Sequence, residues 1–284
     1  MKETTTLKTV LITGCSSGIG LCTAQTLQQS GYRVFATVRK ADDKQKLETS
    51  GLKTLMMDVS DSVSIRAALA ELLQHTGNRL DILINNAGVG QPGALEDLSR
   101  ETLQTLFATN VFGLMELTNA VIPVMRKQGH GRIINISSVL GLVVIPHHGA
   151  AYAASKFTVE ALSDGLRMEL HDSGIKVCLI EPGPIDTEFR RKSRENYQKN
   201  VDASKSQHQA FYQEWVEKTE QKKKESSLTQ SPALVVKKII AAIESKKPKA
   251  RYYVTIPTYF LATLKRLLPV CCLDRILSFI SRKI

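Results

Sequence analysis

Two hydrophobic patterns alternate along the chain. Short apolar runs rich in Val, Ile and Leu are separated by longer stretches in which apolar residues recur every three or four positions. The first pattern predicts buried strands and the second predicts amphipathic helices; their alternation is typical of βαβ units with a parallel sheet. The expected strands are residues 9–13, 33–38, 53–57, 80–85, 132–137, 176–181 and 251–255.

The intervening helices are expected to cover both faces of this sheet. Gly31 follows the first helical stretch, and Gly129 follows the long stretch 110–127, at positions where glycine commonly ends a helix. With right-handed crossovers, the prediction is an α/β fold with a doubly wound parallel sheet of the Rossmann type. The length of 284 residues fits one large domain better than two small ones, so we expect a single domain over 1–284.

The distribution of charge and the spacing of the cysteines exclude some classes of protein. Residues 1–185 carry 17 basic and 17 acidic side chains, whereas 186–284 carry 21 and 10, so the net charge of +11 lies in the last third. The five cysteines lack Cys-x-x-Cys spacing, which predicts neither a disulfide framework nor a metal site. The short polar start predicts no secretory signal, and we expect a cytoplasmic protein.

A glycine-rich loop follows the first expected strand. Its sequence, Thr-Gly-Cys-Ser-Ser-Gly-Ile-Gly over 13–20, lies directly before the first helix. Glycine permits a tight turn and close backbone approach, and a helix N-terminus offers N–H groups to a pyrophosphate. An ordinary tight turn is the alternative interpretation.

Tyr152 and Lys156 stand four residues apart in Tyr-Ala-Ala-Ser-Lys. On a helix this spacing puts both side chains on one face, about 5 to 6 Å apart at Cβ. The ammonium is expected to lower the tyrosine pKa towards neutrality, which suits a general acid or base. Chance produces the spacing on many surface helices, so its weight comes from the glycine loop that precedes it.

Together these motifs resemble the short-chain dehydrogenase/reductase family over roughly residues 8–190. Asn85-Asn86-Ala87-Gly88, Asn110, Ser138 and the Tyr-x-x-x-Lys pair follow the glycine loop in the order that this family uses. The chain is similar to bacterial aldehyde reductases and to steroid and retinol dehydrogenases. The resemblance implies a homodimer or homotetramer and no metal.

The resemblance also implies roles for individual residues. Tyr152 would donate a proton to a carbonyl or accept one from an alcohol, Ser138 would bind the same oxygen, and Lys156 would hold the nicotinamide ribose. Asn110 would bind a relay water through its backbone. The implied cofactor-binding residues are Gly14, Ser16, Ser17, Gly18, Ile19, Gly20, Arg39, Lys40, Asp58, Val59, Asn86, Ala87, Gly88, Tyr152, Lys156, Pro182, Gly183, Ile185 and Thr187.

Several of these residues have a structural alternative. Asp58 and Thr187 suit helix caps, and Asn110 suits a buried backbone kink. Ser138 lies one residue farther from Tyr152 than the family spacing, and Ser137 is the competing serine. The extra residue is placed in the loop 146–150, which is expected to border the substrate.

The cofactor prediction depends on the end of the second strand. Thr37 occupies the place where an acidic residue would bind the ribose of NAD, and Arg39 and Lys40 follow, as suits a 2′-phosphate. We therefore predict NADP(H), with a solvated turn pair as the alternative for the two cations.

Substrate contacts are expected from Ser138, Tyr152 and the variable segment 186–231, a helical lid. His148, Phe211 and Trp215 are the candidates for its substrate wall, although the spacing of Phe211 and Trp215 also suits docking of the lid on the body. His147 and His148 are interpreted as solvated loop residues rather than catalytic groups.

Residues 256–284 combine apolar positions with basic ones around Pro269 and predict two short basic amphipathic helices. These would lie on an anionic membrane surface or pack against the body or a second subunit.

The leading functional hypothesis is NADPH-dependent reduction of hydrophobic aldehydes or ketones. A hydroxysteroid or retinol-type alcohol dehydrogenase is the second. An NADP(H)-sensing regulator or membrane-surface adaptor is the non-enzymatic alternative. Nucleic-acid binding is not expected, because no reading motif accompanies the basic tail.

Overall fold

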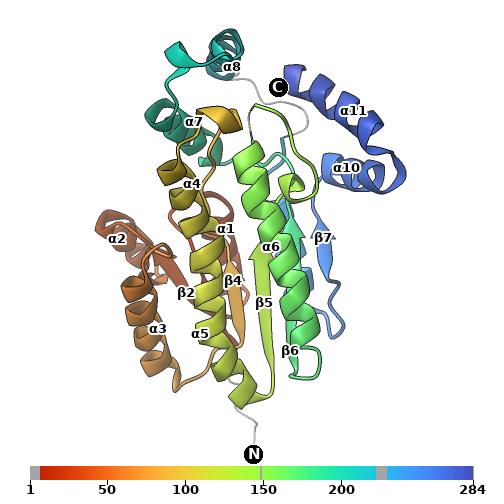
Figure 1. Ribbon diagram of the computed structural model, residues 1–284. Coiled ribbons are helices and arrows are strands. Elements are labelled where there is room, and N and C mark those ends of the chain that lie inside the picture. The colour runs from red at the N-terminus through yellow and green to blue at the C-terminus, as the bar shows by residue number, and fades with distance from the viewer. Residues whose placement is uncertain (1–6, 148, 222–228, 284) are drawn as a thin grey trace, which may run out of the picture.

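The computed structural model describes residues 7–147, 149–221 and 229–283. Within these residues, seven strands form one parallel sheet in the order β3-β2-β1-β4-β5-β6-β7 (Figure 1). The predicted doubly wound α/β fold is confirmed. The strands are β1 (Thr9–Ile12), β2 (Arg33–Val38), β3 (Lys53–Met56), β4 (Ile82–Asn85), β5 (Gly131–Ile136), β6 (Ile175–Glu181) and β7 (Arg251–Tyr253).

Successive residues of a strand pack in hydrophobic layers on opposite faces of the sheet. Val10 and Ile12 belong to the layer that includes α1 (Gly18–Gln29), α2 (Ala41–Thr49) and α9 (Pro232–Glu244). Leu11, between them, belongs to the opposite layer. Helices α3 (Ser62–Thr76), α5 (Gly113–Gln128) and α6 (Ala150–Glu169) form that second layer, and α5 and α6 lie in front of the sheet in Figure 1. Burial on both faces explains the continuous apolar runs of the strands.

Local hydrogen bonds account for the ends of several elements. Helix α3 begins after Asp61, whose side chain accepts from the Val63 N–H, and α5 ends at Gly129 with φ of 72°. Strand β4 begins at Ile82 rather than at residue 80, because the Leu80 N–H donates to the Gln128 side chain at 2.8 Å. Side-chain hydrogen bonds of this kind carry no signal in a hydrophobic pattern.

A π-helical turn, Ala108–Phe112, joins α4 (Arg100–Phe107) to α5. The run Arg100–Gln128 is long and apolar enough to cross a membrane by length and composition alone, but half of its most apolar window is buried inside the fold. Leu117 and Val121 of this run are fully buried in the second layer. The run is therefore a core helix here.

The strand order reverses between β1 and β4, and α/β proteins bind ligands outside the carboxyl ends of the strands at such a point. Helices α7 (Phe189–Asn200) and α8 (Gln209–Gln221) lie over this end (Figure 1). Ile185 and Gln230 form a parallel bridge, and the Asp186 N–H donates to the Gln230 carbonyl at 2.9 Å. The segment that bears α7 and α8 thus leaves and rejoins the body at one place. Residues 222–228 of the expected lid lie outside the described residues.

Candidate active site

The loop between β1 and α1 is tightly packed and ends at a helix N-terminus. Gly14 and Gly18 have φ of 72° and 61°, a region that favours glycine. A Cβ on Gly20 would lie 2.4 Å from the Gly14 carbonyl oxygen. Ser17 is the N-cap residue of α1 and makes no side-chain cap. The loop can therefore present N–H groups of α1 to an anion. A shallow pocket of about 400 Å³ beside it is lined by Gly18 and Thr187 among others.

The Asn86-Ala87-Gly88 segment after β4 supports this loop. Asn86 Nδ2 donates to the Thr13 carbonyl at 2.8 Å and to the Gly14 carbonyl at 3.0 Å. The N–H groups of Asn86 and Ala87 both donate to Thr13 Oγ1 at 2.9 Å. These bonds fix the carboxyl ends of β1 and β4 together at the switch point of the sheet.

Tyr152 and Ser138 meet at the carboxyl end of β5. Tyr152 lies in the first turn of α6, and its phenol lies near the Ser138 hydroxyl, which favours the ionised form of the phenol. Ser138 also accepts from the Leu140 N–H at 3.1 Å as the cap of a short 3₁₀ turn, Val139–Gly141. Ser137, the competing serine, is 3% exposed and turned towards Glu160 instead. The structure thus places Ser138, and not Ser137, beside the phenol.

The expected effect of Lys156 on Tyr152 is wrong in this structure. Burial raises the pKa of Tyr152 well above its ordinary value, and the nearby Ser138 hydroxyl opposes this in part. Lys156 Nζ donates to the Ile136 carbonyl at 2.8 Å and lies 5.8 Å from the Tyr152 ring centre. Burial also lowers the pKa of Lys156, to about 8, partly opposed by Glu160. Loss of hydration is therefore the largest influence on the pKa of Tyr152, and the phenol keeps its proton at neutral pH.

Asn110 and Lys156 both lie close to Gly88. A Cβ on Gly88 would lie 3.4 Å from Asn110 Oδ1 and 3.8 Å from Lys156 Nζ. The Asn110 amide accepts from the Val89 N–H at 2.8 Å and donates to the Val89 carbonyl and to Ser155 Oγ. Its side chain thus serves the structural role named as the alternative, while its backbone lies in the π-helical turn, where regular helical hydrogen bonding is interrupted.

The outer end of the site carries the residues expected to select the cofactor. Thr37 is 1% exposed and its hydroxyl accepts from the Gly14 N–H at 3.4 Å. Arg39 is exposed and lies 3.9 Å from Asp58, and Lys40 is the exposed residue before α2. Asp58 also accepts from the Ser60 N–H at 2.9 Å. The sheet therefore brings Arg39 and Asp58 together from neighbouring strands, and Val59 packs against α5 through Gly113.

The turn after β6 closes the site from another side. The Pro182 carbonyl accepts from the Val139 N–H at 2.8 Å, next to Ser138. A Cβ on Gly18 would lie 3.1 Å from the Thr187 side chain, whose hydroxyl accepts from the Phe189 N–H at 3.3 Å. The glycine loop, the catalytic candidates and this turn are thus contiguous. Gly183 packs against Thr255, and Ile185 is buried at the base of the lid.

Two residues of α7 contact the site, although the sequence analysis gave neither of them a role. The Phe189 ring lies 5.6 Å from the Tyr152 ring, tilted by 57°. Lys192 Nζ donates to Ser17 Oγ at 3.4 Å. The sequence contains a pattern that could have identified this face of α7. Phe189, Ser193 and Tyr197 recur at a helical spacing of four, and Ser193 and Tyr197 are buried.

Phe211 and Trp215, which were predicted to line the substrate site, instead pack between the lid and the body. Trp215 packs edge-on against Tyr197, with ring centres 5.1 Å apart, and both belong to a hydrophobic cluster that joins the lid to the body. Phe211 lies 5.0 Å from His147, so His147 packs against the lid rather than standing in solvent. The docking alternative describes these contacts, and Phe189 is the lid side chain against Tyr152. His148 lies outside the described residues.

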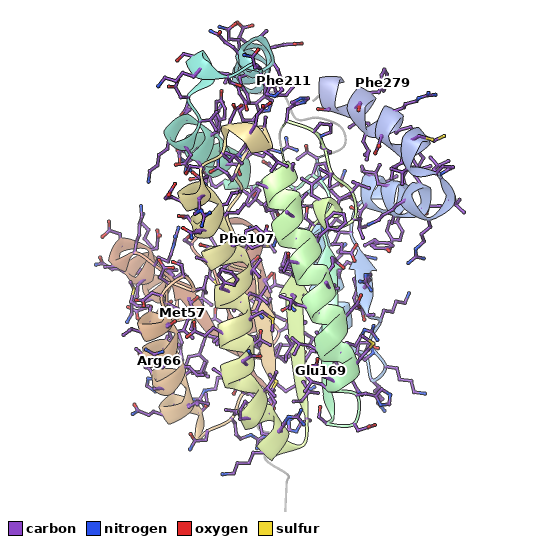
Figure 2. The ribbon with its side chains drawn as sticks, in the orientation of Figure 1. Met57, Arg66, Phe107, Glu169, Phe211 and Phe279 are labelled. Atoms are coloured by element: carbon purple, nitrogen blue, oxygen red, sulfur yellow. The ribbon has the colours of Figure 1, made fainter. Side chains whose placement is uncertain are left out.

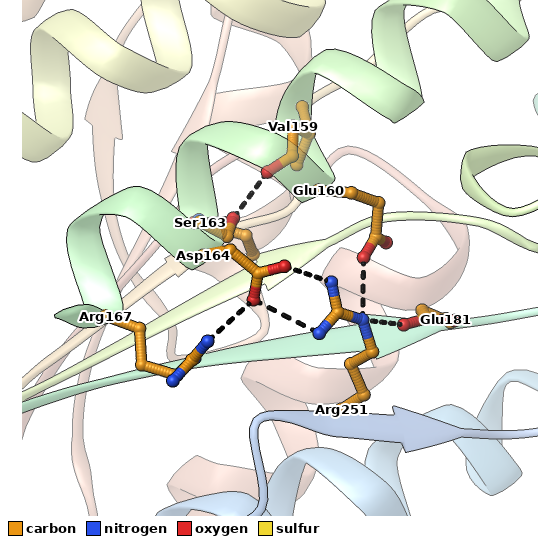
Figure 3. Close-up of polar contacts among 8 residues, drawn as sticks. Val159, Glu160, Ser163, Asp164, Arg167, Glu181 and Arg251 are labelled. Carbon is orange, nitrogen blue, oxygen red and sulfur yellow. Dashed lines mark hydrogen bonds and ion pairs between the residues drawn. The ribbon is translucent and has the colours of Figure 1, made fainter.

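A partly buried cluster of charged side chains joins α6, β6 and β7 (Figure 3). The guanidinium of Arg251 donates to Glu160 at 3.1 Å and to both oxygens of Asp164, and its Nε lies 3.4 Å from Glu181. Glu181 is 0% exposed and neither of its carboxylate oxygens accepts a hydrogen bond from the described residues. Three carboxyl groups therefore face one guanidinium. Burial and the neighbouring Glu160 raise the pKa of Glu181 to about 8.

This cluster should make folding stability depend on pH. The native protein keeps a proton on Glu181 that the unfolded chain releases above about pH 4.5, so unfolding becomes easier as pH rises from there to about 8. The wild-type protein should lose about 3 to 4 kcal/mol of unfolding free energy between about pH 5 and about pH 8 through this carboxyl group, and we expect Glu181→Gln to remove that loss. Denaturant titrations at several pH values measure it. Glu169→Gln, which removes an exposed carboxyl group at the end of α6, is the control. An unchanged pH dependence of the unfolding free energy in the Glu181 variant would contradict the assignment.

Lys192 should contribute to dinucleotide affinity. Its ammonium lies beside Ser17 at the N-terminus of α1, where a diphosphate would bind. We expect Lys192→Ala to raise the dissociation constant of the dinucleotide by about fivefold, since one solvent-exposed ionic contact, which contributes about 1 kcal/mol at most, is lost. Fluorescence titration at two salt concentrations measures this, with Lys199→Ala on the same helix as control. Equal affinities of the two variants would contradict the role.

Comparison with known proteins agrees with this geometry. The model of the short chain dehydrogenase family matches residues 8–198. The oxidoreductase YbbO of Escherichia coli (strain K12) is 43% identical over 271 residues, covering 95% of this chain and 94% of that protein. Human retinol dehydrogenase 8 is 35% identical (91% and 85% covered), and rat 17-beta-hydroxysteroid dehydrogenase type 6 is 33% identical (97% and 89% covered).

Solved structures show the same likeness. A short-chain dehydrogenase from Streptomyces avermitilis has a TM-score of 0.75 at 28% identity, covering 98% of this chain and 96% of that one. Serine dehydrogenase complexed with NADP⁺ has a TM-score of 0.74 at 29% identity (88% and 95% covered). A Burkholderia phymatum relative in complex with NAD has a TM-score of 0.74 at 25% identity (92% and 92% covered). By sequence, fold and the arrangement of its site, this chain belongs to the short-chain dehydrogenase family of oxidoreductases.

Proposed function

We propose that the protein reduces hydrophobic aldehydes or ketones to alcohols with NADPH. The observation that carries the proposal is the geometry of the site, in which the Tyr152 phenol lies near Ser138 and the Lys156 ammonium lies 5.8 Å from the Tyr152 ring centre. A phenol that keeps its proton at neutral pH can protonate a carbonyl oxygen, which is the reductive direction. The tight glycine loop and the N-terminus of α1 fit a dinucleotide, which would supply the hydride when bound.

Four side chains have separate roles in the proposed reduction. Tyr152 donates its proton to the carbonyl oxygen, and Ser138 donates a hydrogen bond to the same atom. Such donors stabilise a developing alkoxide by about 3 to 4 kcal/mol each. Lys156, held by the Ile136 carbonyl, supplies positive charge behind Tyr152 and a donor for the ribose. The Phe189 ring, with its centre 5.6 Å from that of Tyr152, adds an apolar wall beside the phenol.

The preference for NADPH rests on Arg39 and Lys40. Both are exposed at the end of β2, where Thr37 brings no negative charge. The Arg39 guanidinium can donate two parallel hydrogen bonds to a 2′-phosphate, a bidentate contact that is common between arginine and phosphate. One related structure contains NADP⁺ and another NAD, so the family admits both cofactors.

Arg39→Ala tests this preference. We expect the ratio of kcat/KM with NADPH to that with NADH to fall by about tenfold or more, since a charge-assisted contact contributes about 1.5 to 3 kcal/mol. Steady-state kinetics with both cofactors measures it, and Lys44→Ala on α2 is the control. A wild-type enzyme that prefers NADH would contradict the assignment at once.

A hydroxysteroid or retinol-type alcohol dehydrogenase is the second candidate. Two relatives that match most of the chain are a retinol dehydrogenase and a 17-beta-hydroxysteroid dehydrogenase. Turnover of medium and long aldehydes, ketones, retinal and steroids, measured side by side with NADPH, separates the candidates. Tight dinucleotide binding without turnover of any of these would favour a cofactor-sensing regulator instead.

A further inference from the structure

The two C-terminal helices carry an exposed apolar face. They are α10 (Ile256–Leu267) and α11 (Val270–Lys283). Among the described residues, six of the fourteen exposed large hydrophobic side chains lie within these helices or at their junction. Ile256 is 83% exposed, Phe260 57%, and Leu267 73%. Their spacing of four and seven puts these three on one side of α10, where an ordinary water-facing helix would carry polar residues.

The opposite side of the same helices is already occupied. Leu261 and Leu277 are buried in a cluster with Val143, which belongs to the segment between Ser138 and Tyr152. Ser281 donates to the Pro146 carbonyl at 3.0 Å. The inner side of each helix therefore packs on the body, in agreement with one of the sequence-based alternatives, and the outward apolar side of α10 remains to be explained.

The charge of this segment is strongly positive. Residues 256–284 contain five basic residues and one acid, Asp274. Arg266 and Arg275 are exposed on these helices, close to the apolar side chains in sequence, whereas the Lys265 ammonium lies 4.4 Å from the centre of the Phe157 ring of the body. Basic groups around an exposed apolar face match an anionic lipid surface, since each contributes about 1 kcal/mol near such a surface. A two-fold contact with a second copy would instead bring two such basic faces together.

The position of the helices fits the same partner. They lie at the end of the molecule that holds the lid, and Figure 2 shows Phe211 of α8 and Phe279 of α11 at that end. Phe279 is 59% exposed. A surface seated on α10 and α11 would therefore lie near the carboxyl ends of the strands.

We propose that α10 and α11 form a docking surface for an anionic lipid membrane. The helices lie in the plane of the surface, with Phe260 and Leu267 inserted among the acyl chains and the basic groups at the headgroups. Neither helix spans the bilayer, because each has fewer residues than a crossing needs. This inference does not depend on the reaction proposed above.

Flotation of the full-length protein with vesicles tests the surface. Vesicles of phosphatidylcholine alone are compared with vesicles that also contain phosphatidylglycerol. We expect salt-sensitive recovery with the mixed vesicles only. The double variant Phe260→Ser/Leu267→Ser should lower the partition coefficient on the order of a hundredfold, because two buried apolar side chains are lost.

The control is Val63→Ser/Met168→Ser, which removes two equally exposed apolar side chains from α3 and α6. It should bind vesicles as the wild type does. Failure of the wild type to float with mixed vesicles, or equal recovery with both kinds, would overturn the proposal. Sedimentation velocity in which the Phe260/Leu267 variant alone turns a dimer into a monomer would assign the surface to a second copy and overturn it as well.

Discussion

Tyr152→Phe should lower kcat/KM for carbonyl reduction by about 10³-fold or more, while dinucleotide affinity and thermal stability change little. The substitution removes only the hydroxyl, so the ring keeps its contact with Phe189. What is lost is the proton donor, whose contribution is about 10²- to 10⁴-fold, together with a hydrogen bond to the developing alkoxide. The loss should appear in kcat as well as in kcat/KM, because the interaction strengthens in the transition state.

Steady-state and single-turnover kinetics measure this effect, with cofactor binding measured separately by titration. Tyr259→Phe is a matched control, since Tyr259 is 49% exposed on α10 and remote from Ser138 in the sequence. Retention of a tenth or more of the wild-type turnover by the Tyr152 variant would exclude Tyr152 as the proton donor, although it would leave dinucleotide binding by the glycine loop intact.

Gly20→Ala should abolish dinucleotide binding and lower the free energy of unfolding. The new Cβ would lie 2.4 Å from the Gly14 carbonyl oxygen and 2.5 Å from Asn86 Nδ2, and the first of these is backbone that cannot rotate away. Relief requires the loop to separate from Asn86, which breaks the bonds that join β1 to β4. We expect about 2 to 3 kcal/mol of destabilisation, as for other overpacked sites.

Gly165→Ala provides the contrasting control. Gly165 also lies within a helix, α6, but a Cβ there would meet nothing within 4 Å. It should raise the free energy of unfolding by about 0.5 to 1 kcal/mol and leave binding unchanged. Denaturant unfolding and cofactor titration compare the two variants. A Gly20 variant as stable as the wild type would show that the loop accommodates the methyl group.

The sequence specified most of the fold because each strand is buried on both faces. Such strands appear as apolar runs, and all seven were located to within two residues at either end. The predicted ends of β4 and β7 differ from the observed ends by two residues, and each difference has a physical reason. Residue 80 leaves the sheet because of a side-chain bond from Gln128, and Thr255 is the N-cap of α10 rather than part of β7.

The candidate site was predictable where its chemistry lies in one short motif. The glycine loop, Asn86, Ser138, Tyr152 and Lys156 come together as the resemblance implied. The tyrosine pKa was not predictable, because it depends on burial, which the i, i+4 spacing does not reveal. The lid contacts were also missed, since Phe189 and Lys192 reach the site through tertiary packing of α7.

The bridge between Ile185 and Gln230 has a consequence for diversification. The lid departs from the segment after β6 and returns before α9 at adjacent backbone positions, joined by hydrogen bonds from Asp186 and Gln230. An exchangeable cassette needs such a junction, because its length and composition can change without moving the elements it connects. Exchange of the segment between Ile185 and Gln230 with that of a relative would therefore replace α7 and α8 without moving β6 or α9.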